Sequence, residues 1–429
     1  MIQAATIAVL PVGEFDSEPV KDEFDVKVRA LKRLSPNLIV ADAVSDEPSA
    51  RQSVQALVGR TPDVLMLIAL RGHSAEALEA AARLSQVPCL LWPIHGNFAL
   101  PSSALAAGAL RESNLPVELL YGPPEHPVAF EKLRRFTRAA TAFSRIRRSR
   151  IGVIGGLFPN LVACRYDPQV VGTRLGTTLL PISFQAVRDS IGLATQRAGE
   201  VERQRQAITD AYEVMPADRG ALETGLQLHL ALKQMAREQQ LDGFAAECWT
   251  SLPQELGLNP CLGFVDDSYA LACEGDVMLC ISLLLVRHLT GASAYVGDLY
   301  DLDLDGQFTL IHCGAPASLG CGQSEVVLGR SALALERGFE TMTCRPRLAT
   351  GPVTLFRFYG RKCDKLHLAA ADLLGCEQSP NLSVKLKLHG DRWDFLDQCL
   401  GNHYLVVAGD IRGELALLAK WLGVTVFET

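Results

Sequence analysis

Short apolar runs alternate with amphipathic stretches over the first third of the chain. The runs have the length of strands and lie at residues 7–12, 38–41, 64–69, 88–92 and 151–155. Between them, residues 49–57 and 75–84 carry apolar side chains at helical spacing. Strands that alternate with helices are joined by parallel crossovers, so this pattern predicts a doubly wound α/β domain over residues 1–157.

The alternation continues over residues 158–320 with longer helices. We expect a polar helix over residues 185–212, a second helix over residues 221–239, and an apolar helix that starts at Asp276 and stops before Gly291. Strand-like runs lie at residues 243–248, 269–273, 294–298 and 308–312. This region is therefore predicted to be a second α/β domain.

The pattern changes after Gly320. Short β-rich runs at residues 353–359, 382–388 and 404–408 are separated by Gly, Pro and Asp, which predicts a mostly β, barrel-like domain over residues 321–429. An amphipathic stretch at residues 413–422 is expected to close this domain as a helix. The predicted fold class is thus α/β, with two doubly wound α/β domains followed by a β-rich C-terminal domain.

Composition narrows the class of protein. With 429 residues, of which 48% are hydrophobic and 21% charged, the chain is typical of a folded protein of about three domains. The formal charge of −7 offers no basic field for nucleic acid, and no apolar run is long enough to span a membrane. The N-terminal residues lack the pattern of an export signal, so we expect a cytoplasmic protein whose twelve cysteines are reduced thiols.

Carboxylates and histidines gather at the ends of predicted strands. Glu274 follows the run at 270–273, Asp298 closes the run at 294–297, His312 ends the run at 308–311, and His403 precedes the run at 404–407. Carboxylate oxygens with imidazole nitrogens suit Mn²⁺, Mg²⁺, Fe²⁺ or Co²⁺. Asp276 lies beside them, but a position at a helix N-terminus explains that acid equally well. The spacing predicts a divalent-metal site.

Two segments resemble L-fucose isomerases. Ala272-Cys273-Glu274-Gly275-Asp276, followed by an apolar helix and then Asp298, is similar to that family's metal-site segment, and residues 401–410 are similar to the segment that carries its metal-binding histidine. The resemblance implies an aldose–ketose isomerase of a free sugar in which Glu274, Asp298 and His403 hold a catalytic Mn²⁺ or a related cation. It also implies an enediolate mechanism with Glu274 and Asp298 as catalytic residues, and a homo-oligomer with active sites near subunit interfaces.

The resemblance also suggests a role for His312 and a class of substrate. The fucose isomerases have no match to His312, but the related L-arabinose isomerases use two histidines with two carboxylates, which makes His312 the candidate fourth ligand. A compact group of fucose-isomerase-like proteins carries the same His-Cys-Gly run, and its members include isomerases of unusual sugars such as sulfoquinovose. The expected substrate is therefore a deoxy, pentose or sulfonated sugar.

Sugar hydroxyls require polar and aromatic partners, for which several residues are candidates. They are Glu247, Trp249, His95, Asn97 and His389, although a core tryptophan and a strand-end acid are equally ordinary structural features. The arginines between Arg134 and Arg150 are interpreted as a solvated helix, with binding of an anionic substituent as the sharper alternative. A non-catalytic sugar-binding clamp and a metal-dependent lyase or epimerase of sugar acids remain open as alternative functions.

Overall fold

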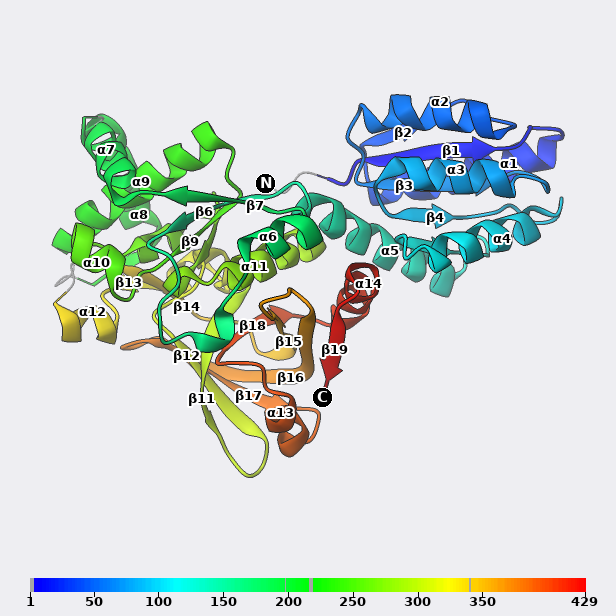
Figure 1. The fold of residues 1–429 in the computed structure, drawn as a ribbon. Coiled ribbons are helices and arrows are strands. Elements are labelled where there is room, and N and C mark those ends of the chain that lie inside the picture. The colour runs from blue at the N-terminus through cyan, green and yellow to red at the C-terminus, as the bar shows by residue number, and fades with distance from the viewer. Residues whose placement is uncertain (1–3, 197, 216–218, 339–340) are drawn as a thin grey trace. The chain divides into compact units, whose positions relative to one another are not determined.

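The computed structural model describes residues 4–196, 198–215, 219–338 and 341–429 (Figure 1). Its contacts divide the chain into two compact units. Unit 1 comprises residues 1–147 and 413–421, and unit 2 comprises residues 148–412 and 422–429. The parts expected as second and third domains therefore pack together within unit 2.

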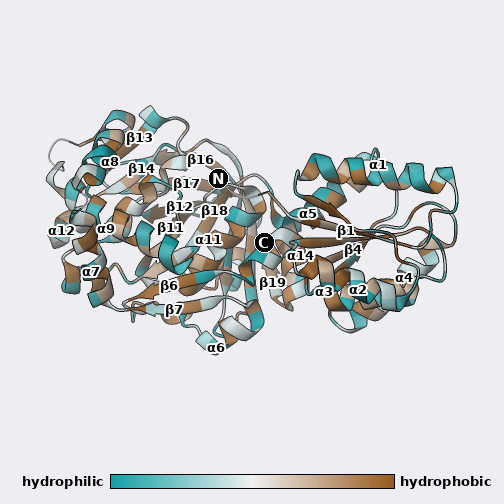
Figure 2. Cartoon of the chain, turned by 90° about the horizontal axis from the view of Figure 1, so that it is seen from above, coloured by the Kyte–Doolittle hydropathy of each residue, from teal (hydrophilic) through white to brown (hydrophobic). Residues whose placement is uncertain are grey.

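Unit 1 is built on a parallel sheet of five strands in the order β2-β1-β3-β4-β5. The strands are β1 (Ile7–Val12), β2 (Leu38–Val40), β3 (Val64–Ala69), β4 (Cys89–Leu91) and β5 (Val117–Leu119). Helix α1 (Glu18–Leu34) covers one face, and α2 (Glu47–Val58), α3 (Ala75–Ser85) and α4 (Ala99–Glu112) cover the other (Figure 2). Every residue of β1 and β3 is buried, as a strand covered on both faces requires. The doubly wound α/β fold class predicted for this part of the chain is confirmed.

The last helix of the chain belongs to unit 1 rather than to the β-rich domain. Residues 413–421 of α14 (Arg412–Leu422) lie with α5 (Pro127–Ile146). The Trp421 ring meets Phe136 and Phe143 edge-on, at centroid distances of 5.5 and 6.0 Å. Since an amphipathic pattern tells only that a helix has an apolar face, it could not tell which unit buries that face.

Unit 2 contains a second parallel sheet, in the order β10-β9-β6-β7. Its strands are β6 (Arg150–Ile154), β7 (Thr178–Ile182), β9 (Gly243–Ala246) and β10 (Ala270–Ala272). The run at residues 151–155, which we expected to end the first domain, is thus β6 at an inner position of this sheet. The helix expected over residues 185–212 is two helices, α7 (Phe184–Thr195) and α8 (Ala198–Ala211), and residue 197 between them lies outside the described residues.

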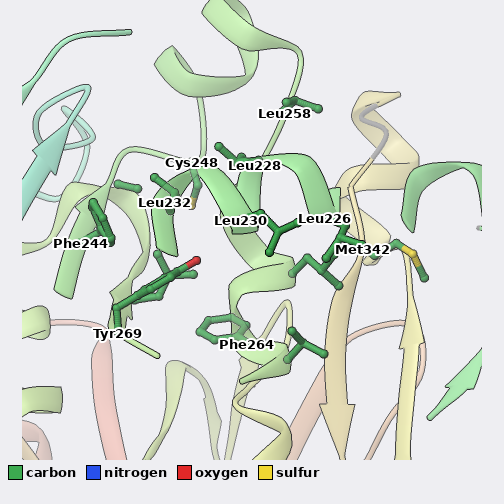
Figure 3. Packing of buried hydrophobic residues seen from close by; sticks show 14 of the residues in the cluster. Leu226, Leu228, Leu230, Leu232, Phe244, Cys248, Leu258, Phe264, Tyr269 and Met342 are labelled. Carbon is green, nitrogen blue, oxygen red and sulfur yellow. The ribbon is translucent and has the colours of Figure 1, made fainter. Parts of the chain in front are cut away.

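A hydrophobic core joins this sheet to its helices (Figure 3). Leucines of α9 (Arg219–Gln239) pack with Phe244, Tyr269 and Met342. A small sheet in the order β14-β13-β8 packs on the same core and consists of β8 (Glu213–Val214), β13 (Val326–Gly329) and β14 (Thr343–Pro346). The remaining helices of unit 2 are α6 (Pro168–Val170), α10 (Ser251–Leu256), α11 (Val277–Thr290), α12 (Ala332–Arg337) and α13 (Arg392–Gln398).

Six antiparallel strands of unit 2 close into a barrel, which confirms the β-rich C-terminal part of the prediction. Around the barrel they are β15 (Gly351–Tyr359), β18 (His403–Ala408), β11 (Tyr295–Leu302), β12 (Gln307–His312), β17 (Leu382–Leu388) and β16 (Lys365–Glu377), and β16 pairs back to β15. A final strand, β19 (Thr425–Glu428), pairs with β16 in parallel. None of the helices in the described part of the chain is long and apolar enough to cross a bilayer.

Strands β11 and β12 are a correction to the expected domain content. The sequence pattern placed them in the second α/β domain, but both are barrel strands paired antiparallel to each other. Hydrophobic runs of this length do not reveal whether a strand pairs parallel or antiparallel. As a result, Asp298 and His312 lie on the barrel, whereas Glu274 lies at the end of the parallel sheet.

Candidate active site

A strained turn places Glu274 at the carboxyl edge of the parallel sheet. Glu274 follows β10 in the left-handed conformation, with φ 58° and ψ 17°, and its carbonyl oxygen accepts a hydrogen bond from the Phe158 amide at 2.9 Å. Gly275 also has a positive φ of 73°, and a Cβ there would lie 1.6 Å from the Gly156 carbonyl oxygen. Only glycine allows this close approach, so the turn fixes the position of Glu274.

The barrel brings Asp298 and His403 together as cross-strand neighbours. The register of β11 and β18 pairs these two residues directly, which places their side chains on one face. His403 Nε2 lies 3.4 Å from Asp298 Oδ1 and 3.8 Å from Glu274 Oε2. Three of the four predicted metal ligands therefore lie around one point, although they come from two different sheets.

The same atom of His403 is a buried polar group without a hydrogen-bond partner in the described residues. His403 is fully buried, and its Nε2 makes none of the hydrogen bonds that such a nitrogen normally needs. The carboxylates of Glu274 and Asp298 face this nitrogen. A cation between the three groups would neutralise the two negative charges and accept the lone pair of the nitrogen. The donor set, two oxygens and an imidazole nitrogen, fits a divalent cation such as Mn²⁺.

Electrostatics at Glu274 agree with that fit. Burial raises the pKa of Glu274 to about 7; the negative charges of Asp298, Asp276 and Glu247 add to this rise, and His403 opposes it. Carboxylates crowded in this way repel one another unless a positive charge lies between them.

His312 lies at the wall of the same cavity. The cavity has a volume of about 250 Å³, and Glu274, Asp298 and His312 line it together with Trp249. His312 Nδ1 lies 3.2 Å from the Gly314 carbonyl oxygen, so the proton resides on Nδ1 and the lone pair on Nε2. Burial lowers the pKa of His312, which favours the neutral imidazole that metals bind.

A second group of possible ligands lies on the other side of His403. Cys164, Asp276 and His403 Nδ1 are close enough together to hold an ion. However, the Arg357 guanidinium already lies there, since its Nη2 pairs with Asp276 Oδ2 and contacts Cys164 Sγ at 3.2 Å. A fixed positive charge disfavours a cation at the same place, so the Nε2 side of His403 is the better metal site.

Asp276 fulfils its expected role as a helix cap and has a second one. Its Oδ1 accepts a hydrogen bond from the Leu279 amide at 2.9 Å at the start of α11. Its Oδ2 lies 3.2 Å from His403 Nδ1 and pairs with Arg357. Burial alone would raise the pKa of Asp276, but Arg357 and His403 together hold it well below its usual range. Sequence reasoning missed Arg357, whose signal is an arginine inside the apolar run 355–359.

The candidate sugar-binding residues are placed in different surroundings. Trp249 lines the cavity and its ring lies 5.8 Å from that of Phe158. Glu247 is buried, and its carboxylate accepts hydrogen bonds from Thr250 Oγ1 at 2.7 Å and Ser251 Oγ at 2.5 Å, which organises the start of α10. His389 Nε2 lies 2.9 Å from Asp372 on the barrel surface and is not among the residues that line the cavity.

The remaining candidates belong to unit 1. His95 Nδ1 lies 3.0 Å from Glu23 Oε1, and Asn97 follows it in the left-handed conformation with φ 48°. Several arginines between 134 and 150 pair with acids of the same unit: Arg134 with Glu131, Arg135 and Arg138 with Glu414, and Arg145 with Asp63. These pairs account for much of the basic run without an anionic ligand.

Comparison with known proteins adds independent information. No family model matches the chain. Curated relatives named sulfoquinovose isomerase occur in Priestia megaterium (23% identical, covering 98% of each chain), Alkalicoccus urumqiensis (23% identical, covering 86% of this chain and 87% of the relative) and a Clostridium species (24% identical, covering 97% of each chain). These relatives confirm the resemblance to sugar isomerases.

Among solved structures, a conserved domain protein from Vibrio cholerae matches 57% of this chain and 75% of its own, at 17% identity and a TM-score of 0.20.

Proposed function

We propose that this protein is an aldose–ketose isomerase that interconverts sulfoquinovose and its 2-ketose with the help of a divalent cation. The observation that carries the proposal is the fully buried His403 Nε2, which lacks a hydrogen-bond partner among the described residues and faces the carboxylates of Glu274 and Asp298. The names of three near full-length relatives support the reaction and the substrate.

In the open-chain sugar the C2 proton moves to C1 through an enediolate while the O2 hydroxyl proton moves to O1, so that the C1 aldehyde becomes a hydroxymethyl group and C2 becomes the carbonyl. When bound, a divalent cation supplies positive charge that stabilises the negative charge developing on the sugar oxygens. Glu274, Asp298 and His403 would hold it, with His312 as the fourth ligand. One of the two carboxylates takes the proton from one carbon and returns it to the other, because both line the cavity in which the sugar would lie.

The sulfonate group places a further requirement on the site. The described residues that line the cavity include acids, amides, thiols and an indole but no lysine or arginine. A sulfonate needs a cationic or strongly hydrogen-bonding partner. As the resemblance to the fucose isomerases implies, we propose that the working enzyme is a homo-oligomer whose site lies near a subunit interface, and sedimentation velocity tests the oligomeric state.

The proposal is tested by assaying sulfoquinovose against glucose, its unsulfonated counterpart, with metal-free protein and after addition of Mn²⁺, Mg²⁺ or Co²⁺. We expect ketose formation from sulfoquinovose, loss of turnover on chelation, and recovery with Mn²⁺. In D₂O the product should carry deuterium on the carbon that receives the proton. Full turnover by metal-free protein would contradict the metal site, and release of a cleaved or epimerised product would favour the lyase or epimerase.

Two variants test the residues. Glu274→Gln and Asp298→Asn should each reduce kcat by at least about 100-fold, since each loses both a ligand charge and a potential base. Asp301→Asn, an exposed acid on the same strand as Asp298, is the matched control and should leave kcat unchanged. Near-normal rates in both site variants would move the active site elsewhere.

A further inference from the structure

We propose that Asp276 and Arg357 are positioning residues that direct His403 Nε2 toward the metal site. The inference rests on the proposed function, because it concerns the same histidine. Asp276, Arg357 and His403 are each fully buried; Asp276 caps the N-terminus of α11, Arg357 lies on β15 and His403 on β18. A histidine can present either ring nitrogen to a metal, so some neighbour must fix which one points to the carboxylates of Glu274 and Asp298.

The contact between Asp276 and His403 fixes the tautomer. An ionised carboxylate accepts hydrogen bonds only, so at 3.2 Å from Asp276 Oδ2 the His403 Nδ1 must carry the proton. In the neutral ring, which is the form that binds a metal, the lone pair then resides on Nε2, the nitrogen that faces Asp298 and Glu274. A carboxylate behind the ring also makes the imidazole a better electron donor to a cation.

Arg357 holds the Asp276 carboxylate in place. Its guanidinium pairs with Asp276 Oδ2, contacts Cys164 Sγ, and lies over the Tyr359 ring at 4.6 Å. Tyr359 Oη in turn donates a hydrogen bond to the His403 carbonyl oxygen at 3.3 Å. The histidine is therefore held through both its ring and its backbone by one buried group of residues.

The cap of α11 gives Asp276 its rigidity. Its other oxygen, Oδ1, accepts the hydrogen bond from the Leu279 amide, so the carboxylate cannot rotate without breaking that cap. Helix α11 follows directly from the turn that carries Glu274. The Asp276 carboxylate thus connects the turn that carries Glu274 to the barrel strand that carries His403. Loss of its charge should weaken metal binding, although Asp276 is not itself a ligand of the metal.

The test compares Mn²⁺ binding to purified wild-type protein and to Asp276→Asn by equilibrium dialysis, with folding checked by circular dichroism. Asparagine keeps the shape and can still cap the helix, but it lacks the charge. We expect the dissociation constant for Mn²⁺ to rise about 10–100-fold. Asp391→Asn, which changes the capping residue of α13 in the same way, is the matched control and should bind Mn²⁺ as the wild type does.

A second variant covers the case in which Asp276→Asn does not fold. Arg357→Lys retains a positive charge beside Asp276 but loses the planar guanidinium group that contacts both Asp276 and Cys164. We expect the dissociation constant for Mn²⁺ to rise less in this variant than in Asp276→Asn.

The possible outcomes distinguish the proposed function from the positioning role of Asp276 and Arg357. Wild-type protein that neither binds Mn²⁺ nor isomerises sulfoquinovose would overturn the proposed function and this inference with it. Wild-type protein that does both, with an unchanged dissociation constant in whichever folded variant is obtained, would overturn the positioning role alone.

Discussion

His367 shows what burial does to a single titratable residue. It lies fully buried in the barrel, where its Nδ1 is 2.7 Å from Tyr404 Oη and its ring lies 4.9 Å from that of Phe395. Burial lowers the pKa of His367 to about 4, because the interior disfavours the imidazolium form. The residue therefore stabilises the barrel only while it is neutral.

The first prediction concerns the pH dependence of this stability. In the unfolded chain a histidine titrates near 6.5, so between about pH 6.5 and pH 4 the unfolded state binds more protons than the folded state. The contribution of His367 is present above pH 6.5 and is lost as the pH falls toward 4. We expect it to remove about 2 kcal/mol from the free energy of unfolding between pH 7 and pH 5, measured by urea titration.

Substitution isolates that contribution. His367→Phe should be less stable than the wild type at pH 7 but should lose less of its stability on going to pH 5. Leu386→Ala, which removes a buried side chain without a titratable group from the same barrel, should lower the stability equally at pH 7 and pH 5 and so keep the wild-type pH dependence. Equal slopes in the wild type and in His367→Phe would show that His367 does not titrate in this range.

At the scale of elements, strands and helices were largely predictable but their partners were not. Runs such as 7–12, 64–69 and 382–388 coincide with β1, β3 and β17, because each apolar run is bounded by turn-forming residues. The antiparallel pairing of β11 with β18 depends on contacts more than 100 residues apart in the chain. Local patterns contain no information about such pairings.

The same distinction applies to the candidate site: residues with a local sequence signal were predictable, and residues defined by a distant partner were not. Glu274, Asp298 and His403 could be identified because each lies at the end of an apolar run within a recognisable segment. Arg357 could not, because its partner Asp276 lies 81 positions away in sequence and meets it only when α11 packs on the barrel. A buried arginine in an apolar strand signals some partner, but not which one.

The turn that carries Glu274 leads to a second prediction. Gly275→Ala must place a Cβ 1.6 Å from the Gly156 carbonyl oxygen and adopt a positive φ, so it should lower the free energy of unfolding by several kcal/mol. Gly257→Ala is the matched control, because Gly257 has a similar φ of 69° but no atom within 4 Å of the new Cβ. It should cost about 1–2 kcal/mol. Equal losses in urea titrations of the two variants would mean that the backbone at Gly275 moves away freely.

At the scale of the whole molecule, chain order and compact units do not coincide. The chain leaves unit 1 at residue 147, builds the parallel sheet and the barrel, and then contributes residues 413–421 to unit 1 before β19 pairs with the barrel strand β16. Each unit therefore depends on the C-terminal segment. Sequence reasoning assigned α14 to the barrel because a helix is usually placed with its neighbours in the chain.

The assignment of α14 to unit 1 gives the last prediction. Trp421 is largely buried against Phe136 and Phe143 of α5, and its Nε1 donates to Glu118 Oε1 at 3.3 Å. Trp421→Ala removes these contacts and leaves a cavity, which typically costs about 3–5 kcal/mol.

Hydrogen exchange measured by mass spectrometry locates the loss. Amides of α5 and β5 should exchange faster in Trp421→Ala than in the wild type, whereas those of β12 and β17 should not change, because the lost contacts belong to unit 1. Lys385→Ala, a surface substitution on β17, is the control and should leave α5 unaffected. Faster exchange in the barrel with α5 unchanged would instead place α14 with the barrel, as the hydrophobic pattern alone had predicted.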